Sequence, residues 1–552
     1  MDYNLADLFE SVVDAAPGRE ALVWLDLPGT GAERRLTYAE LDAAANRIAH
    51  HLTGAGLRPG EHVGIHLYNG VEYLQTLYGC LKARLVPVNV NYRYVGEELA
   101  HLYRDADLAA LVFDGEFGGR VAEALPRAGR LRHLLRVGPP GGSPLPDPAS
   151  DAVADPVPDA VPFAEAASAA SPERGFPARS GNDLLIIYTG GTTGMPKGVM
   201  WRQEDLFFAG LGGGAPKGEP VASPGELAER VAAGGAGLTF FPLPPLMHGT
   251  AVLTAFIAFH YGQRVVLHRR FSPGDALRTV AKERVNAMSL VGDAMLRPLV
   301  DALRGPLRGT DLSSLLTVSS SGAITSATVR ADLAAVAPSV LLLDNFGSSE
   351  SGFNGTAIGD PAAGPALRVE VNARTSVVDP VTHEPVPAGT PGRVAQRGHV
   401  PLGYYNDPAK TAETFFERDG ERWVLLGDMA TVDEAGVVTV LGRGSQCINT
   451  GGEKVYPEEV EQALKAHPAV YDALVAGVPD TVWGHRVAAV VQPRAEAAAP
   501  DLAEIQRHCR ARLAGYKIPR QLVVVERIRR SPSGKADYRW AQSVAAGPRE
   551  PA

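Results

Sequence analysis

The sequence predicts an α/β protein with a large unit over residues 1–444 and a small α+β unit over residues 445–552. Short apolar strands alternate with amphipathic helices along most of the chain, which is typical of parallel strands with helices on both faces. The length of 552 residues exceeds what one hydrophobic core usually covers. Past Gly442 the alternation gives way to shorter mixed elements, so we place the boundary between the units near Ser445.

The alternation is clearest between Leu36 and Tyr94. Apolar residues recur there first with the spacing of a helix and then as a short continuous run, and the same two forms follow again. The pattern predicts a helix over residues 36–52, a strand over 62–68, a helix over 71–83 and a strand over 85–90.

Three later apolar runs are also predicted as strands, at residues 263–271, 315–321 and 339–347. Open α/β sheets bind ligands beyond the carboxyl ends of their strands, so we expect the functional site where these runs end. In the small unit the pattern predicts strands over 472–478 and 486–493 and a helix over 501–514.

Two stretches are predicted as surface loops. Residues 137–180 are rich in Pro, Ala and Asp and contain too few large apolar residues for a core segment. We expect no domain boundary there, because strand-like sequence resumes at Leu184. Residues 210–220 are rich in glycine, but no buried strand leads directly into them, so we expect a surface excursion and not a nucleotide-binding loop.

The composition argues against several classes of protein. A net charge of -9 without any block of Lys or Arg argues against nucleic-acid binding, which needs a basic face. Three widely separated cysteines, Cys80, Cys447 and Cys509, fit neither a disulfide framework nor a CxxC metal site and indicate a reducing compartment. The acidic N-terminus does not have the pattern of a secretory signal, and no apolar window is long enough to span a bilayer. We therefore expect a cytoplasmic enzyme.

The strongest local signal is the segment YTGGTTGMPKG, from Tyr188 to Gly198, which follows a buried strand. Its glycines let backbone amides approach phosphate oxygens, its threonines offer hydroxyl donors, and Lys197 supplies a positive charge. The sequence GxxxxGK[ST] fits no register here, which excludes an ordinary P-loop ATPase. We predict a phosphate-binding loop; the alternative is a Gly/Thr turn at the end of a strand.

YTGGTTGMPKG is similar to the phosphate loop of the adenylate-forming superfamily of acyl-CoA synthetases, nonribosomal adenylation domains and beetle luciferases. The resemblance covers about Leu36 to Tyr538. The sequences of the motifs look closest to those of actinobacterial synthetases for fatty acids and sterol side chains. It implies a large N-terminal domain of mixed sheets flanked by helices, joined by a hinge to a small α+β C-terminal domain. The other family motifs follow in order as SSSGA at 319–323, NFGSSESG at 345–352, WVLLGDMA at 423–430, LGRGSQCINTGGEKVYPEEVE at 441–461 and RSPSGKADY at 530–538.

The resemblance also implies a reaction. ATP would convert a carboxylic acid to its acyl-AMP with release of pyrophosphate, and coenzyme A would then accept the acyl group. Glu350 is implied as the ligand of Mg²⁺, because a hard cation that bridges phosphates needs an oxyanion ligand. Lys535, Glu350, Thr192 and His248 are implied as catalytic. The residues implied to bind ATP or coenzyme A are Thr189, Gly190, Gly191, Thr192, Thr193, Gly194, Lys197, Ser321, Gly322, Ala323, Asn345, Phe346, Gly347, Ser348, Ser349, Asp428, Arg443, Gly451, Gly452 and Lys454.

Several implied roles have a simple chemical reason. Lys535 would neutralise charge between the carboxylate of the acid and the α-phosphate, although a lysine near the end of a chain is normally solvated. Asp428 and Arg443 would contact the ribose. Gly451 and Gly452 would let the pantetheine arm pass close to the backbone, with a plain hairpin turn as the alternative.

The chain departs from the family pattern at two positions. Ser445 occupies the hinge position, where Asp or Lys is usual. Gly190 stands where Ser is common, which removes one hydroxyl donor and leaves the backbone amides in place.

One segment bears on the acid. FPLPPLMHGT, residues 241–250, resembles the segment that flanks the carboxylate, with His248 at the aromatic gate position. Relatives that activate amino acids carry an Asp in this segment and this chain has none, which favours an acid without an α-ammonium group. We expect a fatty, aryl or steroid side-chain acid; the alternative for His248 is a packing histidine.

Two alternatives to this function stay open. An enzyme that adenylates an unusual oxyacid, or that passes the acyl group to an amine or a carrier protein, would have the same ATP motifs. A catalytically silent nucleotide-binding homologue would keep the fold but would not need the distant Lys535. The expected partners are the acid, ATP and coenzyme A, without nucleic acid or an integral membrane segment; the oligomeric state stays open, a homodimer included.

Overall fold

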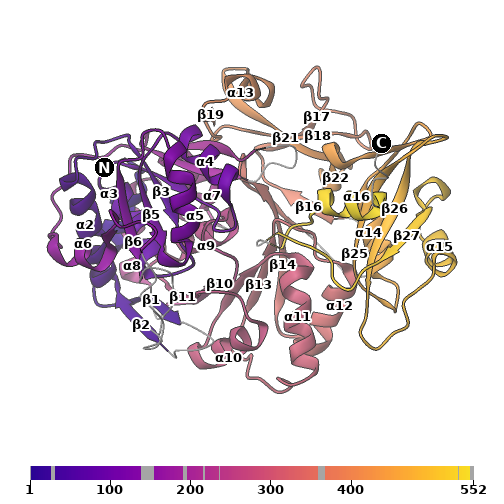
Figure 1. Ribbon diagram of the computed structural model, residues 1–552, viewed down its shortest axis with the longest axis horizontal. Helices are drawn as coiled ribbons and strands as arrows, with labels where there is room; N and C mark the ends of the chain where they lie inside the picture. Colours follow the sequence, from indigo (N-terminus) through magenta and orange to yellow (C-terminus); the bar gives the residue numbers. More distant parts are fainter. Residues whose placement is uncertain are drawn as a thin grey trace.

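The computed structural model describes residues 2–25, 32–138, 155–189, 195–215, 218–234, 237–357, 367–531 and 534–547. In these residues the strands form three sheets (Figure 1), and helices pack around them, so the predicted α/β class is confirmed. The N-terminal elements gather on one side of the molecule and the C-terminal elements on the other (Figure 1).

The largest sheet has fourteen strands and changes direction part-way across. In the half of this sheet that contains β1, β11, β10, β12, β13 and β14 the strands are parallel, and only β2 at the edge is antiparallel to its neighbour. Strand β14 pairs antiparallel with β15, and antiparallel pairing continues beyond it. The sheet order is β17 (Thr375–Val378), β18 (Gly392–Arg397), β21 (Glu421–Val432), β22 (Val438–Arg443), β16 (Leu367–Val371), β15 (Gly352–Ala357), β14 (Leu341–Ser348), β13 (Thr317–Ser321), β12 (Ala287–Leu290), β10 (Thr239–Pro242), β11 (Arg264–His268), β1 (Glu20–Leu25) and β2 (Glu33–Thr37), with β20 (Phe415–Arg418) paired to β21.

The eight-stranded sheet shows the same change of direction. Its strands are parallel up to β8, which then pairs antiparallel with β9. The order is β19 (Gly403–Tyr404), β9 (Lys197–Arg202), β8 (Leu184–Thr189), β4 (Val86–Asn89), β3 (His62–His66), β5 (Leu108–Asp114), β6 (His133–Val137) and β7 (Val161–Pro162).

The third sheet belongs to the C-terminal part of the chain. It has five strands in the order β24 (Glu453–Val455), β23 (Ile448–Thr450), β26 (Gly484–Pro493) and β25 (Val470–Asp480), with β27 (Gln521–Val524) paired to β26. The chain leaves the fourteen-stranded sheet at Arg443 and enters this sheet at Ile448, on either side of Ser445.

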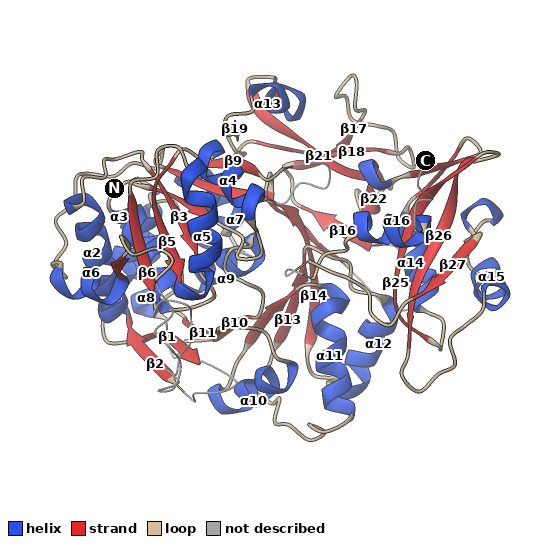
Figure 2. Ribbon diagram, in the orientation of Figure 1, coloured by secondary structure: helices blue, strands red, loops and turns tan. Residues whose placement is uncertain are grey.

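Helices cover the two larger sheets, and α11 and α12 lie side by side next to the C-terminal part (Figure 2). None of the described helices is long and apolar enough to cross a membrane. The helices are α1 (Leu5–Ala15), α2 (Tyr38–Gly54), α3 (Val71–Lys82), α4 (Gly96–Asp105), α5 (Gly118–Ala124), α6 (Phe163–Ala169), α7 (Gln203–Gly210), α8 (Pro224–Ala233), α9 (Gly249–His260), α10 (Pro273–Glu283), α11 (Gly292–Arg304), α12 (Ala327–Val336), α13 (Pro408–Thr414), α14 (Pro457–Lys465), α15 (Leu502–Arg510) and α16 (Tyr538–Ala546).

The predicted elements from Leu36 to Tyr94 are confirmed as α2, β3, α3 and β4. Helix α2 begins where a capping box predicts it, because Thr37 and Glu40 bond each other's backbone amides. Its apolar face packs with α1, α3 and α9 in one buried cluster. The later predicted strands correspond to β11, β13 and β14, and those of the small unit to β25 and β26.

Both loop predictions need correction. The predicted loop over 137–180 contains α6, whose Phe163 and Ala166 are buried in the main core, so two well-spaced apolar residues suffice for a short helix; its residues 139–154 lie outside the described residues. In the glycine-rich stretch Gly213 and Gly214 are buried with positive φ, because this turn packs against Phe207 and Phe208 and does not project into solvent. Residues 216 and 217 there lie outside the described residues.

Candidate active site

A cavity of about 860 Å³ lies between the two large sheets and the segment that precedes and includes α16. Its size is in the ordinary range of roughly 300 to 1,000 Å³ for small-molecule sites. The predicted site residues that line it are Thr189, His248, Ser321, Gly322, Asn345, Phe346, Gly347, Ser348, Ser349 and Lys535.

Two connections begin at the places where the sheets change direction. The predicted phosphate loop connects β8 to β9, and the turn that carries Glu350 connects β14 to β15. Each loop therefore begins at the carboxyl end of the last parallel strand, where open α/β sheets bind ligands.

The described ends of the phosphate loop are Thr189 and Lys197, which face each other in the register of β8 and β9. The ammonium of Lys197 donates to a carboxylate oxygen of Asp407 at 2.7 Å, and this bond lowers the pKa of Asp407. Lys197 is thus held at the start of β9, where the loop ends. Gly190, Gly191, Thr192, Thr193 and Gly194 lie outside the described residues.

The turn after β14 is fixed by side chains from other elements. The indole of Trp201 donates to the backbone oxygen of Ser349 at 2.9 Å, and the hydroxyl of Tyr404 donates to Glu350 Oε1 at 3.1 Å. Burial raises the pKa of Tyr404, and the charge of Glu350 acts in the same direction. Tyr404 therefore stays a donor, and the second oxygen of Glu350 accepts no hydrogen bond from a described residue.

Short polar contacts shape the floor of the cavity. Thr250 at the start of α9 and Ser321 at the end of β13 share a hydrogen bond of 2.8 Å. Asn345 donates to the hydroxyl of Ser319 at 2.7 Å, which ties β14 to β13. Gly322 follows Ser321 with a φ of 76°, a conformation that favours glycine.

Asp428 and Arg443 face each other across β21 and β22. Arg443 Nε lies 3.5 Å from Asp428 Oδ1. Burial raises the pKa of Asp428, which Arg443 opposes, and the charge of Asp428 raises the pKa of Arg443. The structure therefore brings the carboxylate of Asp428 and the guanidinium of Arg443 together.

Lys535 projects from a tight turn into the open side of this site. A Cβ on Gly322 would lie 3.3 Å from Lys535 Cε, so the two residues are in contact. The surrounding protein lowers the pKa of Lys535, with Arg443 acting in the same direction and Glu350 and Asp428 against it. The lysine therefore shares its electrostatic environment with three other predicted site residues.

His248 precedes α9 and also faces Lys535. Burial lowers the pKa of His248 to about 3, and the charges of Lys535 and Arg93 act in the same direction. Its Nε2 is buried and has no hydrogen-bond partner among the described residues. A neutral imidazole that borders the cavity and has a buried, unpartnered nitrogen is compatible with both predicted roles, a contact with the acid and a packing histidine.

Comparison with known proteins decides the family. The profile described as AMP-binding enzyme matches residues 9–405, and that of the AMP-binding enzyme C-terminal domain matches residues 459–535. The chain belongs to the AMP-binding enzymes.

The relatives of this AMP-binding enzyme are similar along its whole length. The medium/long-chain-fatty-acid–CoA/3-oxocholest-4-en-26-oate–CoA ligase of Mycobacterium tuberculosis is 43% identical over 545 residues, which are 98% of this chain and 95% of the relative. The 3-oxocholest-4-en-26-oate–CoA ligase of Rhodococcus rhodochrous is 41% identical over 551 residues, 98% of this chain and 96% of the relative.

Solved structures confirm the fold. An anthranilate CoA ligase in complex with anthranoyl-AMP has a TM-score of 0.81 at 22% identity, covering 99% of this chain and 98% of that one. ATP-bound MatB from Rhodopseudomonas palustris has a TM-score of 0.78 at 25% identity, with 98% of both chains covered. The predicted family, fold class and reaction, an AMP-forming acid–thiol ligation with ATP and coenzyme A, are therefore confirmed.

Some predicted residues of the AMP-binding enzyme lie apart from the cavity. Gly451 and Gly452 form the exposed turn between β23 and β24, with φ of 60° and 88°, and Lys454 follows on β24. A Cβ on Gly451 would lie 2.6 Å from the ring of Trp483, so glycine is required there in this arrangement. Ala323 packs its methyl group against Gly292 and does not line the cavity.

Sequence reasoning missed several residues that support the site. Tyr404 and Asp407 hold Glu350 and Lys197, and both come from the segment GYYNDP at 403–408. The available signal was the dipeptide Asp407-Pro408, a helix start that caps α13 and fixes where Asp407 lies. The sequence around Trp201 gave no such signal, because its contact with the turn at Ser349 forms only in the tertiary structure.

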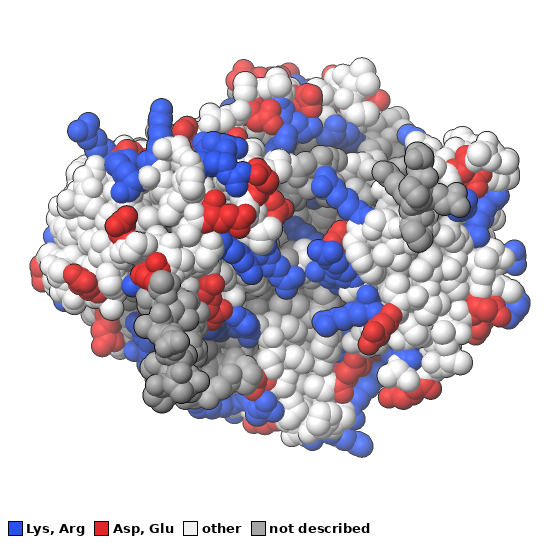
Figure 3. Space-filling view, in the orientation of Figure 1, with Lys and Arg blue, Asp and Glu red and all other residues white. Residues whose placement is uncertain are grey.

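Basic side chains surround the entrance to the enzyme. Figure 3 shows Lys and Arg gathered around the hollow between the two sides of the molecule. A second, wider cleft of about 2080 Å³ opens there, and the arginines that line it are Arg93, Arg120, Arg269, Arg270, Arg297, Arg304, Arg494, Arg527, Arg529 and Arg530. This local basic wall contrasts with the net charge of -9 of the whole chain.

Proposed function

We propose that the acid activated by this enzyme is a largely apolar one, a medium- or long-chain fatty acid or a steroid side-chain carboxylic acid. The observation that carries the proposal is the apolar wall of the 860 Å³ cavity between α7 and α9, which includes Leu206, Gly210, Leu253 and Ile257. The ligases of Mycobacterium tuberculosis and Rhodococcus rhodochrous, whose names give such acids, support it.

The polar end of the cavity fits the first half-reaction. An oxygen of the acid carboxylate attacks the α-phosphorus of ATP, the bond to the β-phosphate oxygen breaks, and pyrophosphate leaves. The ammonium of Lys535 neutralises charge between carboxylate and α-phosphate, and His248 orients the carboxylate through its unused nitrogen. Asp428 and Arg443 hold the ribose, and Lys197, with the hydroxyl of Thr192, holds the phosphates.

Glu350 suits the role of a magnesium ligand. Its carboxylate has one oxygen without a described partner, and the described residues contain no group of three acidic, His or Cys side chains that could hold an ion alone. This matches Mg²⁺, which binds through one or two carboxylates together with substrate phosphates. When bound, the ion would offset the negative charge of the phosphates.

The second half-reaction needs another arrangement of the two parts of the chain. The thiolate of coenzyme A attacks the acyl carbon of the adenylate, and AMP leaves. Because Lys535 now occupies the cavity, we propose that residues 445–552 turn about Ser445 and bring Gly451, Gly452 and Lys454 to the pantetheine arm. The basic wall at the entrance complements the phosphates of both nucleotide substrates.

A cytoplasmic location stays part of the proposal. It is supported by Cys80, Cys447 and Cys509, which are all free thiols, as a reducing compartment requires.

A different acceptor is the second candidate. The amide bond synthetase McbA from Marinactinospora thermotolerans has the same fold, with a TM-score of 0.75 at 24% identity, so the fold is compatible with an amine acceptor. The 43% identity to a named CoA ligase over 98% of the chain favours coenzyme A.

Three measurements test the proposal. ATP–pyrophosphate exchange with a panel of acids should be fastest with long-chain or steroid acids, and product mass should show a thioester only with coenzyme A. Lys535→Ala should abolish acyl-AMP formation and spare thioester formation from supplied acyl-AMP. Equal loss of both half-reactions in Lys535→Ala would contradict the role assigned to Lys535. Exchange limited to amino acids or short polar acids would refute the proposed substrate class.

A further inference from the structure

The turn that carries Lys535 is held at its base by Arg530. Arg530 and Ala536 form an isolated antiparallel bridge, and between them Ser531 exchanges backbone and side-chain bonds with Lys535. The guanidinium of Arg530 donates to the backbone oxygen of Gly534 at 3.2 Å. Any movement of Arg530 therefore moves the lysine.

Arg530 is in turn clamped by Asp472 on β25. Two parallel hydrogen bonds of 2.8 and 2.7 Å join the guanidinium to both carboxylate oxygens. Although burial alone would raise it, Arg530 and then Lys465 lower the pKa of Asp472 to about 2. Such bidentate pairs fix orientation as well as distance.

Lys465, the last residue of α14, connects this clamp to the large unit. Its ammonium lies 3.6 Å from Asp472 and 3.4 Å from Asp293 on α11. Lys465 is only 5% exposed and Asp293 is equally buried. One buried cation is thus shared between a carboxylate of each part of the chain.

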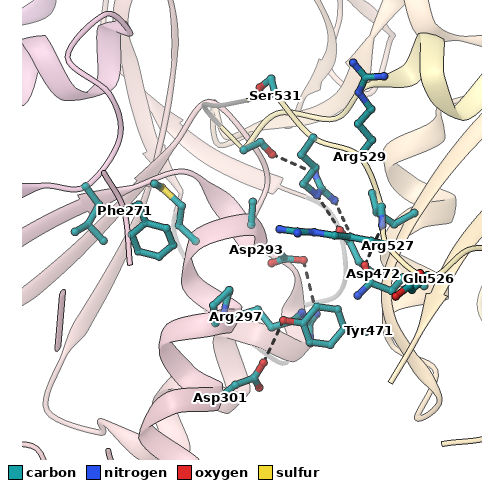
Figure 4. A pocket seen from close by; sticks show the side chains of 18 of the residues that line it. Phe271, Asp293, Arg297, Asp301, Tyr471, Asp472, Glu526, Arg527, Arg529 and Ser531 are labelled. Carbon is teal, nitrogen blue, oxygen red and sulfur yellow. Dashed lines mark hydrogen bonds and ion pairs between the residues drawn. The ribbon is translucent and has the colours of Figure 1, made fainter. Parts of the chain in front are cut away.

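A second contact crosses the same boundary. The hydroxyl of Tyr471, next to Asp472, donates to Asp301 on α11 at 3.2 Å, and the guanidinium of Arg297 lies over the ring of Tyr471. Figure 4 shows Asp293, Arg297 and Asp301 on α11 facing Tyr471 and Asp472 across the cleft. Gly534 completes the contact, since a Cβ there would lie 3.1 Å from the backbone oxygen of Val291.

From these contacts we propose that Lys465 is a positioning residue for acyl-AMP formation. By joining Asp293 to the Asp472–Arg530 clamp, it holds the C-terminal part in the arrangement that inserts Lys535 beside Gly322. Without Lys465, the nearest charge partner of Asp293 among the described residues is the guanidinium of Arg297 at 3.8 Å, so loss of Lys465 weakens the contact that favours this arrangement. The inference rests on the role proposed for Lys535.

The first test uses variants on both sides of the contact. Lys465→Met and Asp293→Asn should each slow acyl-AMP formation at least tenfold in single turnover, and leave thioester formation from supplied acyl-AMP within about twofold. Lys465→Arg should restore most of the adenylation rate, because it keeps the charge. Asp332→Asn, which removes an ion pair with Arg304 inside the large unit, serves as the matched control and should change neither half-reaction.

The outcomes separate positioning from stability. Loss of both half-reactions to the same degree, or a normal adenylation rate in both Lys465→Met and Asp293→Asn, would overturn the proposal. If Lys465 only stabilised the fold, Lys465→Met would lower the melting temperature and the rates of both half-reactions together. Lys465→Arg would then not restore the adenylation rate selectively.

A distance measurement keeps this test independent of the role of Lys535. Spin labels at Ser313 and Ala498, in a Cys447→Ser background, should give one main distance in the parent chain and a second population in Lys465→Met. An unchanged distance distribution contradicts the proposal even if rates fall. If instead Lys535→Ala keeps full adenylation while the distances shift in Lys465→Met, the role of Lys535 fails and the contact stands.

Discussion

At the scale of single residues, the site depends on charges that alter one another. Lys535, Glu350, Asp428 and Arg443 come from four separate segments, yet each affects the ionisation of at least one of the others. Perturbed pKa values of this kind are typical of catalytic sites, because burial strengthens every interaction between charges. The lowered pKa of Lys535 has a direct consequence for activity.

The pH dependence of adenylation should report Lys535. Its ammonium is the active form, and since its pKa is lowered, the charge is lost at a lower pH than in an ordinary lysine. The kcat/KM for acyl-AMP formation, which reflects the free enzyme, should therefore fall on the alkaline side below the usual lysine range. Lys535→Arg should be slower but should lose this alkaline fall, because arginine stays charged.

Circular dichroism over the same pH range provides the control for unfolding. An alkaline fall that is the same in Lys535→Arg and in the parent chain would assign the titration to another group.

At the scale of elements, strand ends and two helices shape the cavity. The end of β8 and the β14–β15 connection bring polar groups, whereas α7 and α9 supply the apolar wall. Gly210, the last residue of α7, matters most for the space available. A Cβ there would lie 3.0 Å from Leu206 and 3.3 Å from Leu253, so even a methyl group would fill the gap between the helices.

Gly210→Leu should shorten the acids that the enzyme accepts. We expect kcat/KM to fall at least tenfold for long-chain and steroid acids and to change little for acids of four to six carbons, measured by ATP–pyrophosphate exchange. Gly225→Leu, at an exposed position in the first turn of α8 where a Cβ would lie 3.9 Å from Ser223 Oγ, is the matched control. A uniform loss across all chain lengths would contradict this place for the acyl chain.

At the scale of the whole molecule, the structure shows one of the two arrangements that we propose for the two half-reactions. Lys535 lies in the cavity, and the turn at Gly451 and Gly452 lies outside it. The connection between the two parts is short, since β22 ends at Arg443 and β23 begins at Ile448. Ser445 lies in a single turn between them, from Gly444 to Gln446.

Ser445→Pro should favour the present arrangement and hinder the other. Proline fixes φ near −65°, which suits a 3₁₀ turn, and Gly444 before it has no Cβ to clash with the ring. Adenylation should stay within about threefold of the parent rate, and overall thioester formation should fall at least tenfold. Ser445→Ala should keep both rates, and normal thioester formation in Ser445→Pro would place the pivot elsewhere.

The sequence by itself determined the alternating elements, the family and most of the chemistry. Local sequence is sufficient for α2, β3, α3 and β4, because α2 shows the period of a helix with one buried face and the other three are apolar segments that are buried almost throughout. The predicted phosphate loop and the roles proposed for Glu350 and Lys535 come from short contiguous motifs, which can be recognised without the tertiary structure. Local composition failed for α6, which joins a core built from distant elements, and for Gly213 and Gly214, which pack against side chains of the flanking segments such as Phe207, Phe208 and Leu227.

Only the tertiary structure decided which residues meet. Tyr404 on Glu350, Asp407 on Lys197 and Lys465 on Asp293 join segments 54 to 210 residues apart. No local pattern encodes such contacts, because they arise when separate sheets pack together and exclude water from the charges between them. The same packing places Lys535 in the cavity and the turn at Gly451 and Gly452 outside it. The sequence contains the residues proposed for both half-reactions and does not indicate which of them lies in the cavity.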